Sequence, residues 1–479
     1  MVIPDHRDPF PSPLTSTPVE VPATTGPCDD VASPESTGSG DQVGDTPQPN
    51  GRLRGHLAIP LFRNAYALAA ATAITSGLGV VYWAVAARHY PKVEVGRGGA
   101  AIASLLLLGG ITQLNLTNTL PRLLPDYGSR GRRIVLLAYG ATVATALAVG
   151  MLYVAFGAVD ESLAGSGSPW PARIGFVGAL MAWNLFTVQD AVLTGIRKAT
   201  WVPVENGLFA LAKIGLLVAL AGRFTHSGIF ASWSLPAAAL VLPVSALLLF
   251  RLIPGQSSSL RPGGALSRSA ALRYSGAEYL GGIFQQATVN LMPILVAAMV
   301  GLEANAAFAT AWIAASAFDL ALASVGLSFT VEGATDQDAL AELSRRAVRL
   351  TAAMTGVGVI AVLVLAPYAM ALLGPGYQGG VAVLRVLALA MPFRAVIILH
   401  LSFMRLSRRL GPIVAIQAAS CAIAVAGAVV ALPRIGIAGA ALGYAVAQGV
   451  VAVMVLPALT RELRQDRTPN SGPVTGGAR

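Results

Sequence analysis

Long apolar runs separated by short polar segments fill the chain between residues 56 and 462. Each run is close to the ~20 residues that a helix needs to cross a ~30 Å hydrocarbon core. The runs cover residues 64–87, 99–120, 134–157, 174–195, 201–221, 228–250, 274–299, 305–329, 350–373, 381–403, 411–431 and 436–459. This pattern predicts an all-α polytopic membrane protein with twelve transmembrane helices.

Both ends of the chain lack such runs. Residues 1–55 are rich in Pro, Ser, Thr, Gly and Asp, and residues 463–479 are also polar. Segments of this composition cannot bury enough apolar surface to fold, so we expect a disordered acidic tail at 1–55 and a second disordered tail at 463–479. We expect no cleavable signal peptide, because no apolar segment follows a basic start.

The distribution of charge supports this topology. Only 12% of the 479 residues are charged, and the net charge is +10. Counted along the sequence, residues 1–50 hold one Arg and eight acidic residues, so the basic excess lies in the remainder, between the apolar runs. Membrane topology and anionic lipids account for basic residues in these places, and nucleic acid is not an expected partner.

The positive-inside rule gives the orientation. With the N-terminus in the cytoplasm, 22 Lys and Arg residues flank the cytoplasmic ends of the spans and six flank the external ends. Adding or omitting one span would place basic clusters on both sides of the membrane and remove this asymmetry. We therefore predict that both termini are cytoplasmic.

A faint internal repeat divides the spans into two groups of six. Arg197-Lys198 and Arg408-Arg409 end corresponding spans, and Gly228-Ile229 and Gly436-Ile437 open corresponding spans. We therefore expect two six-helix lobes, 56–260 and 261–462, related by an axis along the membrane normal. Chance matching in an Ala- and Gly-rich sequence is the alternative.

Several kinds of chemistry lack their usual residues. The chain has no nucleotide-binding loop, no His or Cys pattern typical of a metal site, and two cysteines far apart, Cys28 and Cys421. It also has no long extramembrane segment between the spans that could form a catalytic domain. We therefore expect a transporter rather than an enzyme, with no cofactor and no metal.

Charged residues inside the spans are the first functional candidates, because a charge in the bilayer is costly. Arg394 lies near mid-membrane and could contact a diphosphate or sugar, or form a buried pair with Asp319. Asp319 could instead take up a coupling proton. We expect Asp190, Glu205 and Lys213 to form structural ion pairs or hydrogen-bonded networks, with Arg197 and Lys198 as partners of the two acids.

Short motifs in a fixed order resemble a known family. They are Ala86-Ala87-Arg88-His89-Tyr90-Pro91 with Glu94-Val95-Gly96, Leu120-Pro121-Arg122-Leu123-Leu124-Pro125, Gly374-Pro375-Gly376-Tyr377, Val383-Leu384-Arg385-Val386-Leu387-Ala388-Leu389, and Leu432-Pro433-Arg434-Ile435-Gly436-Ile437-Ala438-Gly439-Ala440-Ala441. Together they resemble the polysaccharide exporters of the MOP superfamily (multidrug, oligosaccharidyl-lipid and polysaccharide transporters), of Wzx type.

The resemblance implies a MATE/MOP-like fold, alternating access, and a cavity lined by helices 1, 2, 7 and 8. Helix 2 carries Gln113, Asn115 and Asn118, and helix 7 carries Glu278, Gln285, Gln286 and Asn290. Their amides suit sugar hydroxyls, and Glu278 is a second candidate for ion coupling. Hydrogen bonding between helices is the alternative role of these residues.

The function implied is that of a flippase for an undecaprenyl-diphosphate-linked oligosaccharide, a precursor of a cell-surface polysaccharide or lipopolysaccharide, in a bacterial cytoplasmic membrane. Its partners would be that lipid-linked saccharide, membrane lipids, and a polysaccharide polymerase or glycosyltransferases. Span 64–87 has no Arg, which departs from the peptidoglycan-precursor flippases and argues against lipid II as cargo. The alternatives are a drug/cation antiporter of the same superfamily and a non-transporting scaffold for polymer assembly.

Overall fold

A computed structural model describes residues 77–127, 131–157, 168–224, 226–254, 268–335, 340–407 and 409–465. All of them belong to the compact unit Arg54–Arg479. Within these ranges the chain is helical and contains no strand. The expected tail at 1–55 lies outside the described residues, as do residues 466–479 of the second tail, whereas 463–465 continue the last helix.

The first half of the chain contributes a helix over 77–89 and helices α3 to α8, here called the N-terminal helices. Their bounds are α3 Lys92–Thr112, α4 Leu116–Tyr127, α5 Gly131–Ala155, α6 Pro169–Gly195, α7 Val202–Leu220 and α8 Gly228–Leu247. A 3-10 turn, Ala199–Trp201, precedes α7, and a π-helical turn, Leu248–Leu252, continues α8.

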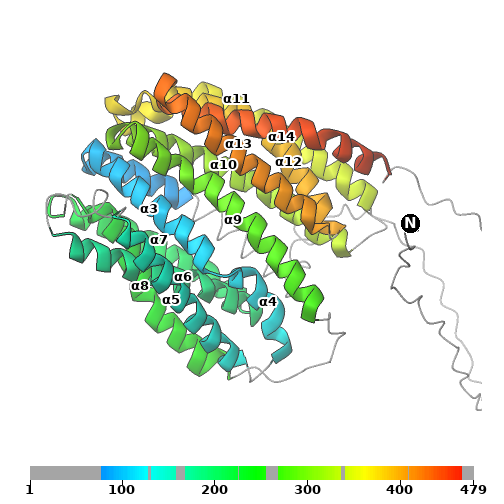
Figure 1. Ribbon diagram of the computed structural model, residues 1–479, viewed down its shortest axis with the longest axis horizontal. Coiled ribbons are helices and arrows are strands. Elements are labelled where there is room, and N and C mark those ends of the chain that lie inside the picture. Colours follow the sequence, from blue (N-terminus) through cyan, green and yellow to red (C-terminus); the bar gives the residue numbers. More distant parts are fainter. Residues whose placement is uncertain are drawn as a thin grey trace, which may run out of the picture. The chain divides into compact units, whose positions relative to one another are not determined.

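The second half contributes the C-terminal helices. These are α9 Arg268–Met299, α10 Leu302–Thr335, α11 Leu340–Leu373, α12 Gly380–Leu406, α13 Leu410–Ile435 and α14 Ile437–Gln465. A 3-10 turn, Pro375–Tyr377, joins α11 to α12, where Gly374 adopts a φ of 118° that favours glycine. Figure 1 shows α9 to α14 side by side, and α12, α13 and α14 contact one another.

Eleven helices in the described part of the chain are long and apolar enough to cross a membrane. They correspond to the second through twelfth expected spans. The first expected span, 64–87, is described only from residue 77, and that part is helical. Leu137, Ile174, Leu242, Val357 and Val453 are each more than half exposed, as lipid-facing side chains would be. The chain is therefore a multi-pass membrane protein.

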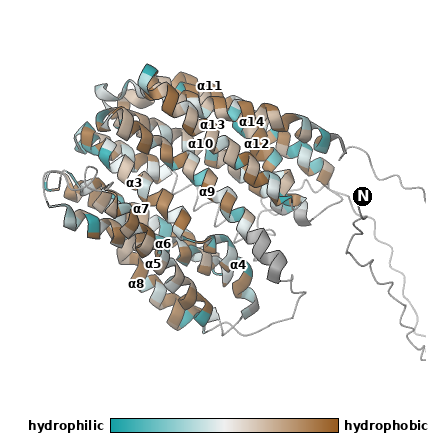
Figure 2. Cartoon of the chain, viewed as in Figure 1, coloured by the Kyte–Doolittle hydropathy of each residue, from teal (hydrophilic) through white to brown (hydrophobic). Residues whose placement is uncertain are grey.

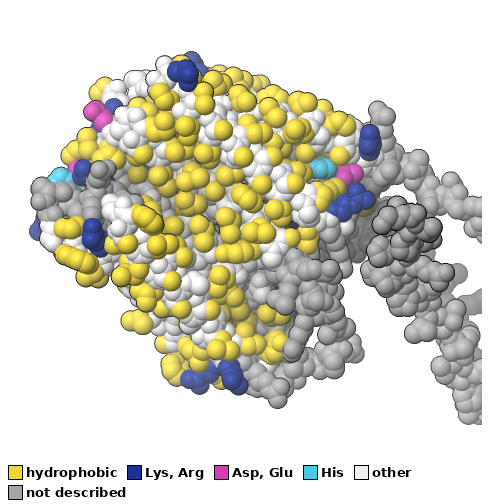
Figure 3. Space-filling model, in the orientation of Figure 1, with side chains coloured by type: hydrophobic (Ala, Val, Ile, Leu, Met, Phe, Trp, Pro, Cys, Tyr) yellow, Lys and Arg dark blue, Asp and Glu magenta, His cyan; other side chains and the backbone are white. Residues whose placement is uncertain are grey.

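The surface of the protein is also mainly hydrophobic. In Figure 2 most helical turns are coloured as hydrophobic, and Figure 3 shows hydrophobic side chains over most of the visible face, with Lys and Arg toward its margins. The described charged residues between the apolar runs 305–329 and 350–373 extend two of the helices. Residues 331–335 end α10, and residues 340–349 are the first turns of α11, because Ala, Leu, Glu and Arg are good helix formers.

Helix α3 joins the two groups of helices. It contacts α5, α6 and α8 on one side and α9 and α10 on the other. A side chain at Gly96 would place its Cβ 1.7 Å from the carbonyl oxygen of Leu302, so only glycine permits this approach of α3 to α10. Asn305 donates a 2.8 Å hydrogen bond to the carbonyl of Gly96 at the same contact.

Candidate functional site

The second expected span, 99–120, is not one helix. Helix α3 ends at Thr112 and α4 begins at Leu116, and the intervening Leu114 and Asn115 have φ values of 52° and 58°. Left-handed backbone at two consecutive non-glycine residues is uncommon and costs energy. The sequence was interpreted as one helix with Gln113, Asn115 and Asn118 facing a cavity, so the break was missed, although Pro121 and Pro125 within α4 were a signal of irregular helix.

The break lies near the middle of its neighbours. Asn184, the sixteenth of 27 residues in α6, donates a 2.5 Å hydrogen bond to Thr112 Oγ1. Thr145, the fifteenth of 25 residues in α5, donates a 2.8 Å hydrogen bond to the Thr112 carbonyl. These partners satisfy polar groups at the end of α3, and they place the break at the depth where discontinuous transport helices bind substrate.

Helix α9 of the C-terminal helices faces the same region. A Cβ at Gly110 would meet Gln286 Cγ at 3.0 Å, and the hydroxyl of Tyr279 donates to the carbonyl of Ile111. Beyond the break, Arg122 Nη2 on α4 lies 3.5 Å from Glu278 Oε2 on α9. We call the contact of α3 and α4 with α9 and α10 the seam.

Some of the amide side chains predicted to line the cavity lie in the seam, and others lie elsewhere. Asn115 is buried in the break, and Asn118 donates to its side-chain oxygen over 2.8 Å. Gln113 is half-buried beside Asn115, within the same turn. Gln286 lies in the seam, where its side chain faces Gly110 near the end of α3.

The other two predicted amides on α9 serve contacts within the C-terminal helices. Gln285 accepts a hydrogen bond from the buried Gln417 of α13. Asn290 is buried and donates over 2.9 Å to the carbonyl of Gln286 in its own helix. Gln285 thus makes the hydrogen bond between helices that was its alternative role, whereas Asn290 bonds within its own helix.

Arg394 forms the buried pair that was one of its two expected roles. Its Nε lies 2.8 Å from Asp319 Oδ1 and its Nη2 lies 3.4 Å from Oδ2, so α12 is tied to α10. Arg394 is 6% exposed. Both candidates for substrate or ion binding in this region are thus engaged with each other, and Glu278, the second coupling candidate, is engaged with Arg122.

The three residues expected to form structural ion pairs do not form them within the described part of the chain. Both oxygens of Asp190 accept from Asn206 Nδ2, at 3.1 and 2.9 Å, because α7 brings that amide, rather than Arg197 or Lys198, against α6. Glu205 is 6% exposed, and neither of its carboxyl oxygens has a hydrogen-bond partner among the described residues.

Lys213 is held by aromatic rings instead of an acid. Its Nζ lies 3.9 Å from the ring centre of Trp233, 5.0 Å from that of Phe209 and 5.2 Å from that of Tyr82. The faces of such rings attract a cation. Phe209 lies one turn before Lys213 on α7, whereas Tyr82 and Trp233 come from other helices, so the sequence near Lys213 showed only part of this cage.

One ionic cluster was not expected. Glu94, at the start of α3, is buried and contacts Arg97 Nη1 at 2.6 Å and His226 Nδ1 at 2.8 Å.

Outside the spans, burial raises the pKa of the Tyr377 hydroxyl to about 12, so this side chain stays neutral. Among the described residues no group of three or more His, Cys, Asp and Glu could hold a metal ion.

Comparison with known proteins identifies the fold. No protein-family model and no curated protein matches the chain. Among solved structures, an inward-facing multidrug resistance MATE family transporter of the MOP superfamily matches with a TM-score of 0.61 and 12% identity, over 83% of this chain and 96% of that one. The lipid II flippase MurJ, in an inward closed conformation, matches with a TM-score of 0.61 and 11% identity, over 83% of this chain and 88% of that one.

A third match is MATE in complex with MaL6, with a TM-score of 0.58 and 14% identity, over 85% of this chain and 97% of that one. The described helices therefore have the MATE/MurJ-like fold, as the sequence predicted.

Proposed function

We propose that this chain is a flippase that moves an undecaprenyl-diphosphate-linked oligosaccharide across a bacterial cytoplasmic membrane by alternating access. The observation that carries the proposal is the helix break between α3 and α4, which lies at mid-depth and adjoins Gln286 of α9 in the seam. Discontinuous helices between the two halves of a transporter are typical places for a substrate.

The chemistry of the break suits a sugar head group. Its polar side chains are the amides of Gln113 and Asn115, which can both donate and accept hydrogen bonds, as sugar hydroxyls do. In this proposal Asn115 and Gln286 contact the saccharide, while the prenyl chain stays in lipid. We do not assign the diphosphate to Arg394, because Asp319 holds that guanidinium at two positions.

The test measures how much lipid-linked saccharide reaches the outer leaflet of cells with and without the protein. The protein's absence should abolish this translocation, and Gln286→Ala and Asn115→Ala should each reduce it severalfold. Asn206→Ala is the matched control, because its amide serves Asp190 and lies outside the seam. Normal translocation in cells lacking the protein would refute the proposal.

The same experiment separates the alternatives. An antiporter for drugs or cations would leave saccharide translocation intact in its absence and change drug resistance instead. A scaffold would be required for translocation, yet Gln286→Ala and Asn115→Ala would have no effect. Partner enzymes, a polymerase or glycosyltransferases, would act on the same lipid-linked saccharide before or after its transfer.

A further inference from the structure

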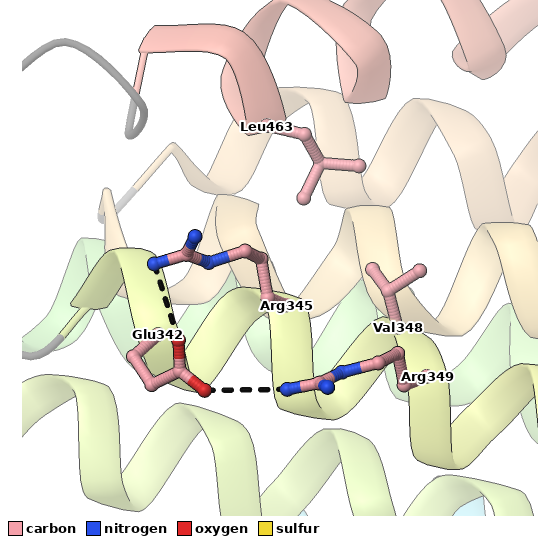
Figure 4. A pocket seen from close by; sticks show the side chains of 5 residues that line it. All are labelled: Glu342, Arg345, Val348, Arg349 and Leu463. Atoms are coloured by element: carbon pink, nitrogen blue, oxygen red, sulfur yellow. Dashed lines mark hydrogen bonds and ion pairs between the residues drawn. The ribbon is translucent and has the colours of Figure 1, made fainter.

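A cavity of about 560 Å³ lies between the start of α11 and the end of α14, away from the seam. The described residues that line it are Glu342, Arg345, Val348, Arg349 and Leu463. Figure 4 shows the first four on α11 and Leu463 reaching in from α14. The volume falls within the ~300–1,000 Å³ of ordinary ligand pockets.

The cavity lies where the protein surface changes from charged to apolar. Helix α11 has 34 residues and is about 51 Å long, well beyond a ~30 Å hydrocarbon core. Its exposed large apolar side chains begin at Leu350 and include Val357, Ile360 and Val364, and all of them follow Arg349. On α14 the apolar surface at Val453, Met454 and Leu456 gives way to the exposed Arg461. The cavity therefore lies at the membrane–water boundary, on the side that the basic residues predict to be cytoplasmic.

The cavity has a polar rim and an apolar floor. Val348 and Leu463 pack against a buried cluster that includes Phe329, Phe403 and Leu459. On the rim, the side chains of Arg345 and Arg349 are 56% and 72% exposed, and Glu342 accepts one ion-pair contact from each, at 3.1 and 3.2 Å. This combination matches the boundary between a lipid's head group and its acyl chains.

The two arginines retain capacity for an anion. Two guanidinium groups share one carboxylate, which leaves a net positive charge on the rim. A guanidinium has five N–H donors. Among the described residues, Glu342 is the one protein acceptor of Arg349, and Arg345 donates otherwise only from Nε to the Ala341 carbonyl. The remaining donors have the fork geometry that binds phosphate oxygens.

We propose that this cavity binds the phosphate head group of an anionic phospholipid of the cytoplasmic leaflet. Arg345 and Arg349 hold the phosphate, and the first segment of the acyl chains lies on Val348 and Leu463. The bound lipid links α11 to α14 within the C-terminal helices. The site is independent of the proposed substrate, because none of its residues lies in the seam.

The test is a lipid titration of the purified full-length protein in detergent, with bound lipid counted by native mass spectrometry. Dioleoylphosphatidylglycerol should bind more tightly than dioleoylphosphatidylcholine, and added salt should weaken its binding. In the double variant Arg345→Ala/Arg349→Ala, affinity for phosphatidylglycerol should fall about tenfold or more. Arg346→Ala is the matched control, because this exposed neighbour does not line the cavity, and its affinity should change less than about twofold.

Three results would overturn the proposal. One is equal affinity of the double variant and the Arg346→Ala control. Another is equal binding of phosphatidylglycerol and phosphatidylcholine. The third is tighter binding of undecaprenyl diphosphate than of phosphatidylglycerol, by about tenfold or more, if the same double variant abolishes that binding. This result would make the cavity a loading site for the carrier lipid. If the double variant does not fold, the separate Arg345→Lys and Arg349→Lys variants, which keep the charge but lose the fork, should each weaken binding measurably.

Discussion

Arg394 illustrates how a single charge is kept inside a membrane helix. An isolated ion at this depth is costly, but Asp319 neutralises the guanidinium with a charge-assisted hydrogen bond of 2.8 Å. Arg385 on the same helix is exposed, as expected for a residue nine positions away on the opposite face. The two arginines of one helix therefore have different roles.

The Arg394–Asp319 pair should be a major contribution to stability. Arg394→Ala leaves the half-buried carboxylate of Asp319 without its partner, and we expect the free energy of unfolding to fall by about 3 kcal/mol, near the lower end of values for buried pairs. Arg385→Ala, the control, should change it by less than about 0.5 kcal/mol. Denaturant unfolding in detergent micelles measures both values.

Replacing both partners checks the cause of that loss. Arg394→Met with Asp319→Leu leaves no unpaired charge, so this double variant should be more stable than Arg394→Ala alone. Equal stability of the Arg394→Ala and Arg385→Ala variants would show that the pair does not hold α10 and α12 together.

The contrast between Arg394 and Lys213 shows how far single residues could be predicted. The pairing of Arg394 with Asp319 was one of two expected roles, because each is a lone charge deep in an apolar run. The cage of Lys213 was not foreseen, because Tyr82 and Trp233 reach it from other helices. Sequence indicates that a buried charge needs a partner, but not which partner the packing supplies.

At the scale of elements, the break between α3 and α4 is held in a costly backbone conformation. Leu114 is 40% exposed and has a φ of 52°. Leu114→Gly removes the steric penalty, so we expect the free energy of unfolding to rise by about 1 kcal/mol. Leu137→Gly, at an exposed position inside α5, should lower it by about 1 kcal/mol. Thermal unfolding of the two variants makes the comparison, and a loss of stability at Leu114→Gly would argue against the left-handed turn.

The close approach of α3 to α10 gives a second prediction at this scale. Gly96→Ala forces its Cβ onto the backbone of Leu302, and we expect a loss of about 1–3 kcal/mol in the free energy of unfolding. Gly140→Ala, in α5, meets no atom within 4 Å and should be neutral or stabilising by up to about 1 kcal/mol. The same unfolding measurement tests both, and a tolerated Gly96→Ala would mean that α3 and α10 lie further apart.

The elements themselves were predictable to different degrees. Hydropathy located the second through twelfth spans, because lipid-facing side chains must be apolar along their whole length. It missed the break at 113–115, because the polar residues there were interpreted as the cavity-lining side of one continuous helix. It also missed the extension of α11 back to Leu340, which hydropathy cannot register because those turns are charged.

At the scale of the whole molecule, links close both ends of the seam. At one end, Asn305 binds the Gly96 carbonyl, Lys92 lies 3.6 Å from Glu303, and Arg88 Nη2 donates over 3.1 Å to the Leu372 carbonyl. At the other end, Arg122 and Glu278 form an ion pair. The alternating access proposed above requires these two sets of links to break in turn.

The Arg122–Glu278 pair should therefore govern access from its side. In a background lacking Cys28 and Cys421, we expect Glu278→Gln to raise the labelling rate of a Gln113→Cys variant by a membrane-impermeant maleimide, applied from the predicted cytoplasmic face. Glu342→Gln, which breaks an ion pair outside the seam, is the control and should leave the rate unchanged. A rate unaffected by Glu278→Gln would mean that this pair does not close the seam.

A pathway through the seam is tested most directly by joining α4 to α9. A cleavable thiol linker connects Arg122→Cys and Glu278→Cys, and translocation of lipid-linked oligosaccharide is measured in proteoliposomes. Linking should stop translocation and cleaving the linker should restore it. The same linker between Arg97→Cys on α3 and His226→Cys just before α8, both in the N-terminal half of the chain, should leave translocation unchanged. Undiminished translocation with α4 and α9 joined would contradict a pathway through the seam.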